Sequence, residues 1–223
     1  MNPTLRVSRR LAVAEKPRVK EILSLLARHY PEPRTALRFS NPLELLVATV
    51  LSAQCTDVRV NLVTQDLFHK YRTARDYADA PRQQLEKDIH STGFFRSKAR
   101  AIQGFSSVIL EKHTGEVPGT MEELVKLPGV GRKTANLVLA EAFGVPGMVV
   151  DTHVSRVSQR LGLSARRGPD KIELDLMKAV PRDRWNHFSL QLIDHGRKVC
   201  KARTPRCDEC FLLKLCPTGL SRV

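Results

Sequence analysis

Four cysteines near the C-terminus carry side chains that bind metals. Cys200, Cys207, Cys210 and Cys216 stand with six, two and five residues between them, and we call this segment the four-cysteine loop. Structural zinc is usually held by two separated Cys-x2-Cys pairs, whereas here only Cys207 and Cys210 form such a pair. Four thiolates in a short loop also suit a [4Fe-4S] cluster, although neither common ferredoxin spacing matches. The ligand chemistry leaves zinc and an iron-sulfur cluster as alternatives.

A lysine at the start of a predicted helix is the second candidate for chemistry. Pro128, Gly129 and Gly131 interrupt a helical pattern, because proline cannot continue the hydrogen-bond ladder and glycine permits positive φ. A new helix is predicted to begin near Arg132, with Lys133 in its first turn. The positive end of the helix dipole disfavours a charged amine there, which raises the fraction of free amine. A free amine can form a Schiff base with a sugar, but a phosphate contact or a solvated side chain is the alternative.

The same interruption predicts a helix, a tight hairpin and a second helix. Residues 120–123, Thr-Met-Glu-Glu, read as a capping box for a first helix that runs to about Leu127. Backbone N–H groups of Gly129, Val130 and Gly131 at the positive end of the second helix can bind a phosphate without reading base sequence. A compact turn with no ligand is the alternative.

A carboxylate follows eighteen residues after Lys133. Asp151 directly precedes a helical stripe that includes Val154, Val157 and Leu161, so it is predicted to cap that helix. The same carboxylate could assist a deprotonation or stabilise positive charge that develops on a deoxyribose ring.

The composition favours a polyanionic partner. The 223-residue chain has a formal net charge of +14 and a pI near 10.0, and its length fits one large or two small domains. Aromatic residues make up only 5%, which argues against a platform for stacking single-stranded bases. Double-stranded DNA or RNA is therefore the leading partner, and a ribosomal or merely soluble basic protein is the alternative.

The sequence predicts a cytoplasmic protein, associated with the nucleoid if the organism is prokaryotic. Residues 1–20 are mixed and basic with no apolar core of a signal peptide, and no stretch approaches the roughly 18 apolar residues of a membrane span. Clustered thiols in a reducing compartment bind metal more often than they form disulfides. The fifth cysteine, Cys55, lies far from the others in an apolar segment and is predicted to be a small buried residue.

Helix signals occur along most of the chain, so we predict an all-α fold. Apolar residues at helical spacing or helix-start residues mark the segments 19–26, 41–51, 58–63, 79–93 and 99–109. The segment 41–51 begins with Asn-Pro and is apolar on all sides, which is typical of a capped, central buried helix. The only strand candidate is the run of residues 148–150.

The order of these motifs resembles the endonuclease III family of helix-hairpin-helix DNA glycosylases and abasic-site lyases. The resemblance extends from about residue 17 to Pro217. It rests on the segments LPGVGRKTAN (127–136), VDTH (150–153), HGR (195–197) before the four-cysteine loop, LSAQCTD (51–57) and GFFRSKA (93–99). It implies that the four cysteines hold a [4Fe-4S] cluster.

The resemblance also implies a fold of two helical domains that flank a DNA cleft. Residues 35–145 would form a six-helix barrel that contains the helix-hairpin-helix at about 121–143. Residues 1–34 would return to pack with residues 146–223 in a discontinuous iron-sulfur domain. We expect the protein to act as a monomer on double-stranded DNA that contains damaged pyrimidines or abasic sites.

The family's catalytic roles fall on Lys133 as the Schiff-base lysine and Asp151 as the catalytic aspartate. The implied activity is excision of oxidised pyrimidines, followed by strand cleavage at the abasic site by β-elimination. An adenine-specific mismatch glycosylase shares the fold, aspartate and cluster but typically lacks the lysine, so Lys133 argues against it. A non-catalytic DNA-binding or redox-sensing iron-sulfur protein remains the alternative from another class.

The resemblance implies DNA contacts at five further side chains. Gln54 matches a glutamine that fills the space left by a flipped nucleotide, and Lys201, Arg203 and Arg206 match a loop that touches the DNA backbone. Phe94 stands where a leucine wedge is common in the family. Phenylalanine is also an apolar side chain that can enter a base step.

Overall fold

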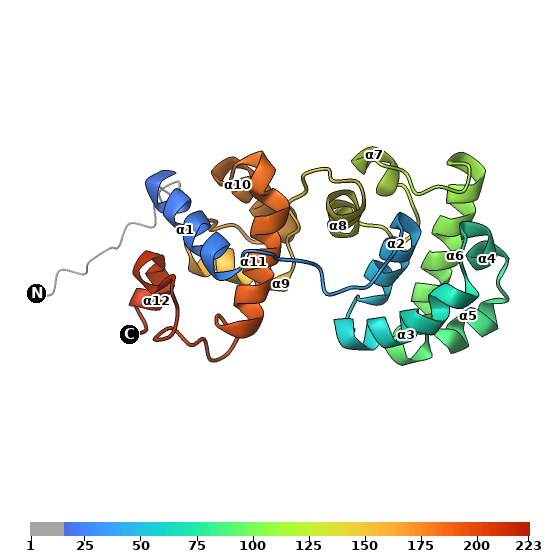
Figure 1. The fold of residues 1–223 in the computed structure, drawn as a ribbon, viewed down its shortest axis with the longest axis horizontal. Helices are drawn as coiled ribbons and strands as arrows, with labels where there is room; N and C mark the ends of the chain where they lie inside the picture. Colours follow the sequence, from blue (N-terminus) through green and yellow to red (C-terminus); the bar gives the residue numbers. More distant parts are fainter. Residues whose placement is uncertain (1–15) are drawn as a thin grey trace, which may run out of the picture. The chain divides into compact units, whose positions relative to one another are not determined.

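The computed structural model describes residues 16–223, and these residues form helices joined by turns and loops (Figure 1). They contain no strand, so the all-α prediction is confirmed, and the strand candidate at residues 148–150 has no regular secondary structure. The described chain divides into two compact units. We call residues 34–147 the hairpin unit and residues 16–33 with 148–223 the cluster unit. Residues 1–15 of the predicted iron-sulfur domain lie outside the described part.

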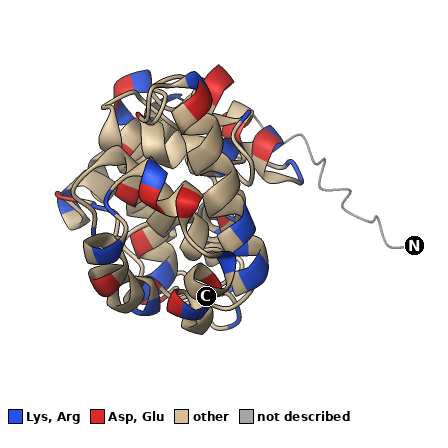
Figure 2. Ribbon diagram, turned by 90° about the vertical axis from the view of Figure 1, so that its right-hand side faces the viewer, with Lys and Arg blue, Asp and Glu red and all other residues tan. Residues whose placement is uncertain are grey.

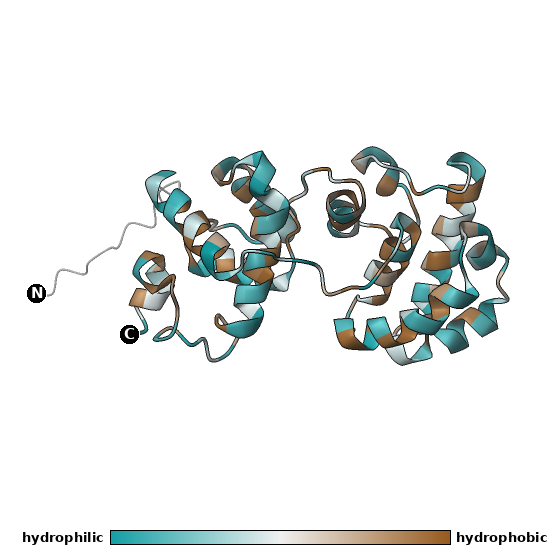
Figure 3. Cartoon of the chain, in the orientation of Figure 1, coloured by the Kyte–Doolittle hydropathy of each residue, from teal (hydrophilic) through white to brown (hydrophobic). Residues whose placement is uncertain are grey.

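The hairpin unit is built around one apolar helix. Its helices are α2 (Pro42–Leu51), α3 (Asp57–Lys70), α4 (Ala74–Asp79), α5 (Arg82–Asp88), α6 (Phe95–Lys112), α7 (Met121–Leu124) and α8 (Arg132–Ala142), with a 3-10 turn at His90–Thr92. Asn41 Oδ1 accepts the Glu44 N–H at 2.9 Å, and Pro42 occupies the first turn of α2. Residues 45–51 are all buried, and α2 is largely brown in Figure 3. The predicted capped central helix is thus confirmed.

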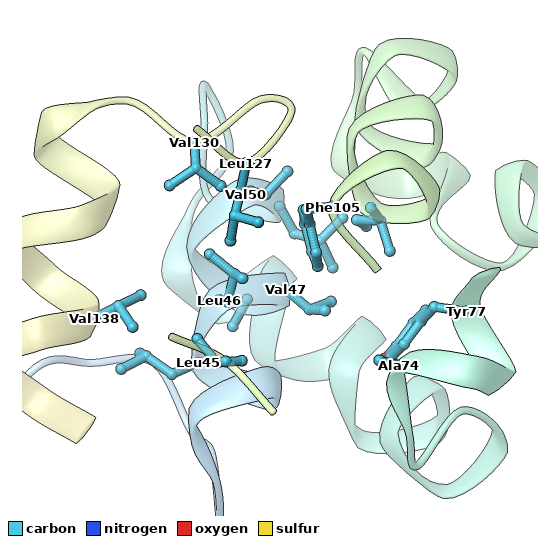
Figure 4. Packing of buried hydrophobic residues seen from close by; sticks show 14 of the residues in the cluster. Leu45, Leu46, Val47, Val50, Ala74, Tyr77, Phe105, Leu127, Val130 and Val138 are labelled. Carbon is cyan, nitrogen blue, oxygen red and sulfur yellow. The ribbon is translucent and has the colours of Figure 1, made fainter. Parts of the chain in front are cut away.

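The core of the hairpin unit fixes the hairpin itself. Helix α2 packs against α8, α3 and α6. Leu127 and Val130 of the hairpin belong to the same buried cluster as Leu46 and Val50 of α2 (Figure 4). Burial of such a side chain contributes about 1.5–3 kcal/mol, so the hairpin is anchored by its own apolar residues.

The cluster unit joins both ends of the described chain. Its helices are α1 (Lys16–His29), α9 (Thr152–Arg160), α10 (Pro169–Ala179), α11 (Trp185–Lys198) and α12 (Pro217–Leu220), with 3-10 turns at Arg182–Arg184 and Leu213–Leu215. Helix α11 packs against both α1 and α9. Arg18 of α1 donates to the Leu161 and Leu215 carbonyls at 2.8 and 2.9 Å, which ties the N-terminal helix to the C-terminal half of the chain.

Two predicted helices differ in the structure. The helix predicted to run to about Leu127 ends at Leu124, because the N–H groups of Lys126 and Leu127 bond three residues back in turns. The segment 79–93 is not one helix: α5 ends at Asp88 and a 3-10 turn follows. No helix in residues 16–223 is long and apolar enough to cross a membrane.

Candidate active site and metal centre

The four cysteines of the loop line one hollow in the cluster unit. Apolar residues such as Val157 and Leu161 form part of its wall, together with basic residues such as Arg160. Burial raises the pKa of the Cys210 thiol to about 11, and the other three thiols raise it further. Among the described residues, no group of three or more His, Cys, Asp or Glu side chains is arranged to hold a single ion. Four soft ligands around an apolar hollow fit an iron-sulfur cluster, whose positive irons would relieve the repulsion between thiolates.

N–H groups approach the sulfur atoms of the loop. The Gly219 N–H donates to Cys216 Sγ at 3.2 Å, and Arg160 Nη1 donates to Cys200 Sγ at 3.3 Å. Such hydrogen bonds stabilise the negative charge of thiolate ligands and help to set the potential of a cluster. The surroundings of the sulfurs therefore suit thiolates that ligate iron.

A buried histidine contacts one of these sulfurs. Tyr30 Oη lies 3.3 Å from His195 Nδ1, and His195 Nε2 lies 3.5 Å from Cys210 Sγ. Burial lowers the pKa of His195 to about 4, so the ring is neutral near pH 7. A neutral ring that accepts the Tyr30 hydroxyl at Nδ1 carries its proton on Nε2, where it can donate to sulfur. The sequence placed His195 in a motif but did not indicate this contact.

Arg160 of α9 holds the backbone of the four-cysteine loop. Its Nη1 donates to the Lys201 carbonyl and its Nη2 to the Ala202 carbonyl, both at 2.7 Å. These bonds fix the segment on which the exposed side chains of Lys201 and Arg203 lie. Sequence reasoning missed Arg160, because its partners are about 40 residues away along the chain.

Arg206, the third predicted basic contact, has partners within the cluster unit. Its Nη2 donates to the Lys198 carbonyl, and its Nη1 lies 3.1 Å from Glu209 Oε2. Exposed ion pairs contribute about 0–1 kcal/mol, so a DNA phosphate could replace Glu209 as the partner. The role of Arg206 in DNA binding stays a prediction, and part of its charge is already neutralised.

The three hairpin residues predicted to bind phosphate have different local roles. Gly129 has φ of +77°, and a Cβ there would lie 2.5 Å from the Ala101 Cβ, so the fold itself requires glycine. The Val130 N–H donates to the Leu127 carbonyl at 3.1 Å, and the Val130 side chain is buried. Both the N–H and the side chain of Val130 therefore stabilise the turn. At Gly131, a Cβ would have no atom within 4 Å. The fold does not require glycine at this position, whereas close approach of a ligand would.

Lys133 is an exposed residue in the first turn of α8. Gly131 is the N-cap and offers no side chain to the first N–H groups of the helix. No acidic residue lies in this first turn, where Arg132 precedes Lys133. The amine thus extends from a positive helix end into solvent, where a substrate can reach it.

Asp151 caps α9 as predicted. Its Oδ1 accepts the Val154 N–H at 2.8 Å, and the residue is half-buried. Burial lowers the pKa of His153, two residues further along the chain. The Asp151 carboxylate opposes this shift, and the positive charges of Arg156 and Arg197 add to it. Asp151 belongs to the cluster unit and Lys133 to the hairpin unit. Their pairing across a DNA cleft stays a prediction.

Gln54 and Phe94 meet at a second hollow, within the hairpin unit, which Gly129 also lines. Gln54 has φ of +54° and Phe94 has φ of +48°, in the left-handed region that residues other than glycine rarely adopt. Each such conformation costs on the order of 1–3 kcal/mol and is typical of functional sites. Phe94 is 63% exposed, and Gln54 is exposed too. Cys55 beside it is only partly buried against the core, which corrects the expectation of a buried residue.

Two family models match separate parts of this chain. Residues 47–182 match the HhH-GPD superfamily of base excision DNA repair proteins. Residues 200–216 match the iron-sulfur binding domain of endonuclease III. The second match covers the four cysteines and no other cysteine of the chain.

Similar proteins span nearly the whole chain. Endonuclease III of Synechocystis sp. is 54% identical over 211 residues, which is 94% of this chain and 96% of that protein. A solved non-covalent endonuclease III–DNA complex is 48% identical, with a TM-score of 0.89 over 93% of this chain and 97% of that one. A trapped endonuclease III–DNA covalent intermediate has the same identity and TM-score and covers 93% and 98% of the two chains.

Proposed function

This chain belongs to the endonuclease III family, and we infer from this membership that it is a base excision repair enzyme. It is a DNA glycosylase that removes damaged pyrimidines and a lyase that cuts the resulting abasic site. Its substrate is DNA, and its four-cysteine loop holds a [4Fe-4S] cluster. The observation that carries the inference is the similarity to endonuclease III over nearly the full length of the chain, including the hairpin and the four-cysteine loop.

We propose that Lys133 and Asp151 carry out the reaction. The Lys133 amine forms a bond to C1′ of the sugar, and the bond from C1′ to the base breaks with its electron pair on the base, which takes up a proton. Asp151 stabilises the positive charge on the sugar or accepts a proton. Loss of the amine proton and ring opening leave an imine between Lys133 and C1′. Removal of a C2′ proton and departure of the 3′ phosphate then cut the strand.

The hairpin and the second hollow serve DNA binding and base extrusion. The bare N-terminus of α8 at Gly131 suits a phosphate, because its N–H groups and dipole attract an anion. Extruding a base costs a few kcal/mol, less for a damaged pair. Phe94 enters the base step and Gln54 occupies the space that the nucleotide leaves. The exposure of both side chains at one hollow supports these roles.

The four cysteines would hold the cluster, and their ligation would keep the basic segment with Lys201 and Arg203 in shape. We place the enzyme in the cytoplasm as a monomer, at the nucleoid in a prokaryote, where its DNA substrate lies. The chain has 37 Lys and Arg residues and 23 Asp and Glu residues. In the part of the chain that the structure describes, both kinds of charged residue are spread over the ribbon (Figure 2). This excess suits a phosphate backbone.

The activity is tested with two 5′-labelled duplexes, one with a single thymine glycol and one with a preformed abasic site. We expect base release and strand cleavage on the first, cleavage on the second, and a borohydride-trapped adduct on both. An undamaged duplex is the control and should stay intact. Absence of both base release and cleavage at enzyme excess would contradict the proposed function.

Replacing Cys207 by Ala removes one of four cluster ligands. We expect the purified variant to lose most of the iron, about four atoms per chain in the native protein, together with its visible absorbance and its affinity for DNA. Cys55→Ala is the matched control, because Cys55 lies in the hairpin unit outside the loop, and it should keep its iron. Equal iron loss in the two variants, or stoichiometric zinc in native protein prepared without oxygen, would contradict the assignment.

Replacing Arg203 by Ala should weaken binding to undamaged duplexes of any sequence alike. The logarithm of affinity falls with the logarithm of salt concentration by about 0.9 per neutralised phosphate, so the slope should decrease by up to about one unit. Fluorescence anisotropy at several salt concentrations measures this slope. Arg75→Ala, an exposed arginine on α4, is the control and should leave the slope unchanged. If Arg203→Ala keeps the wild-type slope, the four-cysteine loop does not contact DNA phosphates.

A further inference from the structure

A buried lysine in the hairpin unit has no role in the reaction described above. Lys98 lies in the first turn of α6 and is only 5% exposed. Its Nζ donates to the Leu51 and Thr92 carbonyls, each at 2.8 Å. Burial lowers the pKa of Lys98, and the nearby Cys55 side chain opposes this shift. A buried ammonium is costly unless its donors are satisfied, and these two carbonyls accept two of its hydrogen bonds.

The two carbonyls stand just before the two strained residues of the second hollow. Leu51 is the last residue of α2, three residues before Gln54. Thr92 ends the 3-10 turn, two residues before Phe94. Lys98 therefore holds the end of α2 and the end of the 3-10 turn, each of which lies two or three residues before a residue with left-handed backbone, Gln54 or Phe94. A conformation that costs on the order of 1–3 kcal/mol at each residue persists only when its surroundings fix it.

Lys98 also lines the hollow at which Gln54 and Phe94 meet. One side chain therefore joins two loops that are about 40 residues apart along the chain and that open onto the same hollow. Capping alone offers a simpler role, because α2 has no basic residue in its last turn and Lys98 supplies a positive charge there. A cap would support the stability of the unit but would not favour one DNA substrate over another.

We propose that Lys98 is a positioning residue for base extrusion, which holds Gln54 and Phe94 in the geometry that enters the base stack. It does not touch the reacting atoms. The proposal rests on the proposed function, in which Gln54 and Phe94 replace the extruded nucleotide while Lys133 performs the covalent step. Loss of Lys98 should therefore slow those steps that need extrusion and spare those that do not.

Lys98→Met keeps the length of the side chain and removes its donors. In single-turnover assays, we expect excision of thymine glycol paired with adenine to slow by about tenfold or more. Cleavage of a preformed abasic site, which needs less help to leave the stack, should change by less than about threefold. The same lesion in an unpaired bulge should regain most of the lost rate. Lys112→Met on the same helix, an exposed lysine, is the control and should match the wild type on every substrate.

A mutant cycle tests whether Lys98 acts through the two residues. Added to a Gln54→Ala/Phe94→Ala variant, Lys98→Met should slow excision little further, because its effect is already lost. Lys98→Gln, which keeps an amide donor, provides a second variant if Lys98→Met does not fold, and should lose less activity. Equal losses on paired and abasic substrates, or additive losses in the cycle, would overturn the proposal. Borohydride trapping by wild-type protein separates this outcome from failure of the proposed function, since that failure would leave no adduct at all.

Discussion

Lys133→Gln is expected to abolish the borohydride-trapped adduct on abasic DNA while leaving affinity for that DNA within about tenfold, or 1.4 kcal/mol. Glutamine has no amine, so neither the bond to C1′ nor the imine can form. Lys133 is exposed in the first turn of α8, and its replacement leaves no cavity. Removing a positive charge from the positive end of a helix does not weaken that helix. The chemistry should therefore be lost while the fold is kept.

The measurement is a single-turnover trapping assay on a preformed abasic site, with binding measured in parallel. Lys126→Gln is the matched control, because Lys126 is another exposed lysine a few residues before the hairpin. Its variant should trap as the wild type does. An adduct formed at wild-type yield by Lys133→Gln would mean that a different amine is the nucleophile, and the assignment of Lys133 would have to be withdrawn.

Asp151→Asn is expected to slow base removal by a factor on the order of a hundred or more, as for loss of an acid–base or electrostatic group. The amide oxygen of asparagine can still accept the Val154 N–H, so the cap of α9 survives while the negative charge disappears. Single-turnover release of thymine glycol measures the effect. DNA binding should persist, because the residues proposed to contact phosphates are unchanged.

Two variants separate charge from capping at Asp151. Asp151→Ala loses both and should also lower the free energy of unfolding by about 1 kcal/mol, whereas Asp151→Asn should not. Asp170→Asn changes an exposed carboxylate in the first turn of α10 and should leave base removal unchanged. If Asp151→Asn releases the base at the wild-type rate, Asp151 serves only as a helix cap and has no catalytic role.

Local signals in the sequence were enough to predict the helix starts that carry much of the candidate site. The caps at Asn41 and Asp151 and the start of α8 beside Lys133 were predicted correctly, because a cap or a glycine break acts within about four residues. The all-apolar segment of α2 likewise indicated a central helix without knowledge of its partners. Helices and their ends were less predictable elsewhere: α4, α10 and α11 were not predicted, and α7 ended early. Short helices such as α4 and α7 depend on tertiary packing more than on propensity.

The sequence by itself determined the candidates for the chemistry of this protein, which are four clustered thiols, an amine at a helix start and a carboxylate at a cap. Tertiary structure alone decided how several side chains are held in place. Lys98 bonds across 47 residues to Leu51, and Arg160 bonds across 41 residues to Lys201. No pattern in the sequence marks such contacts, because each side chain bonds a backbone carbonyl, a group that every residue carries. Which carbonyl lies within 3 Å of a given lysine or arginine depends on how distant helices pack.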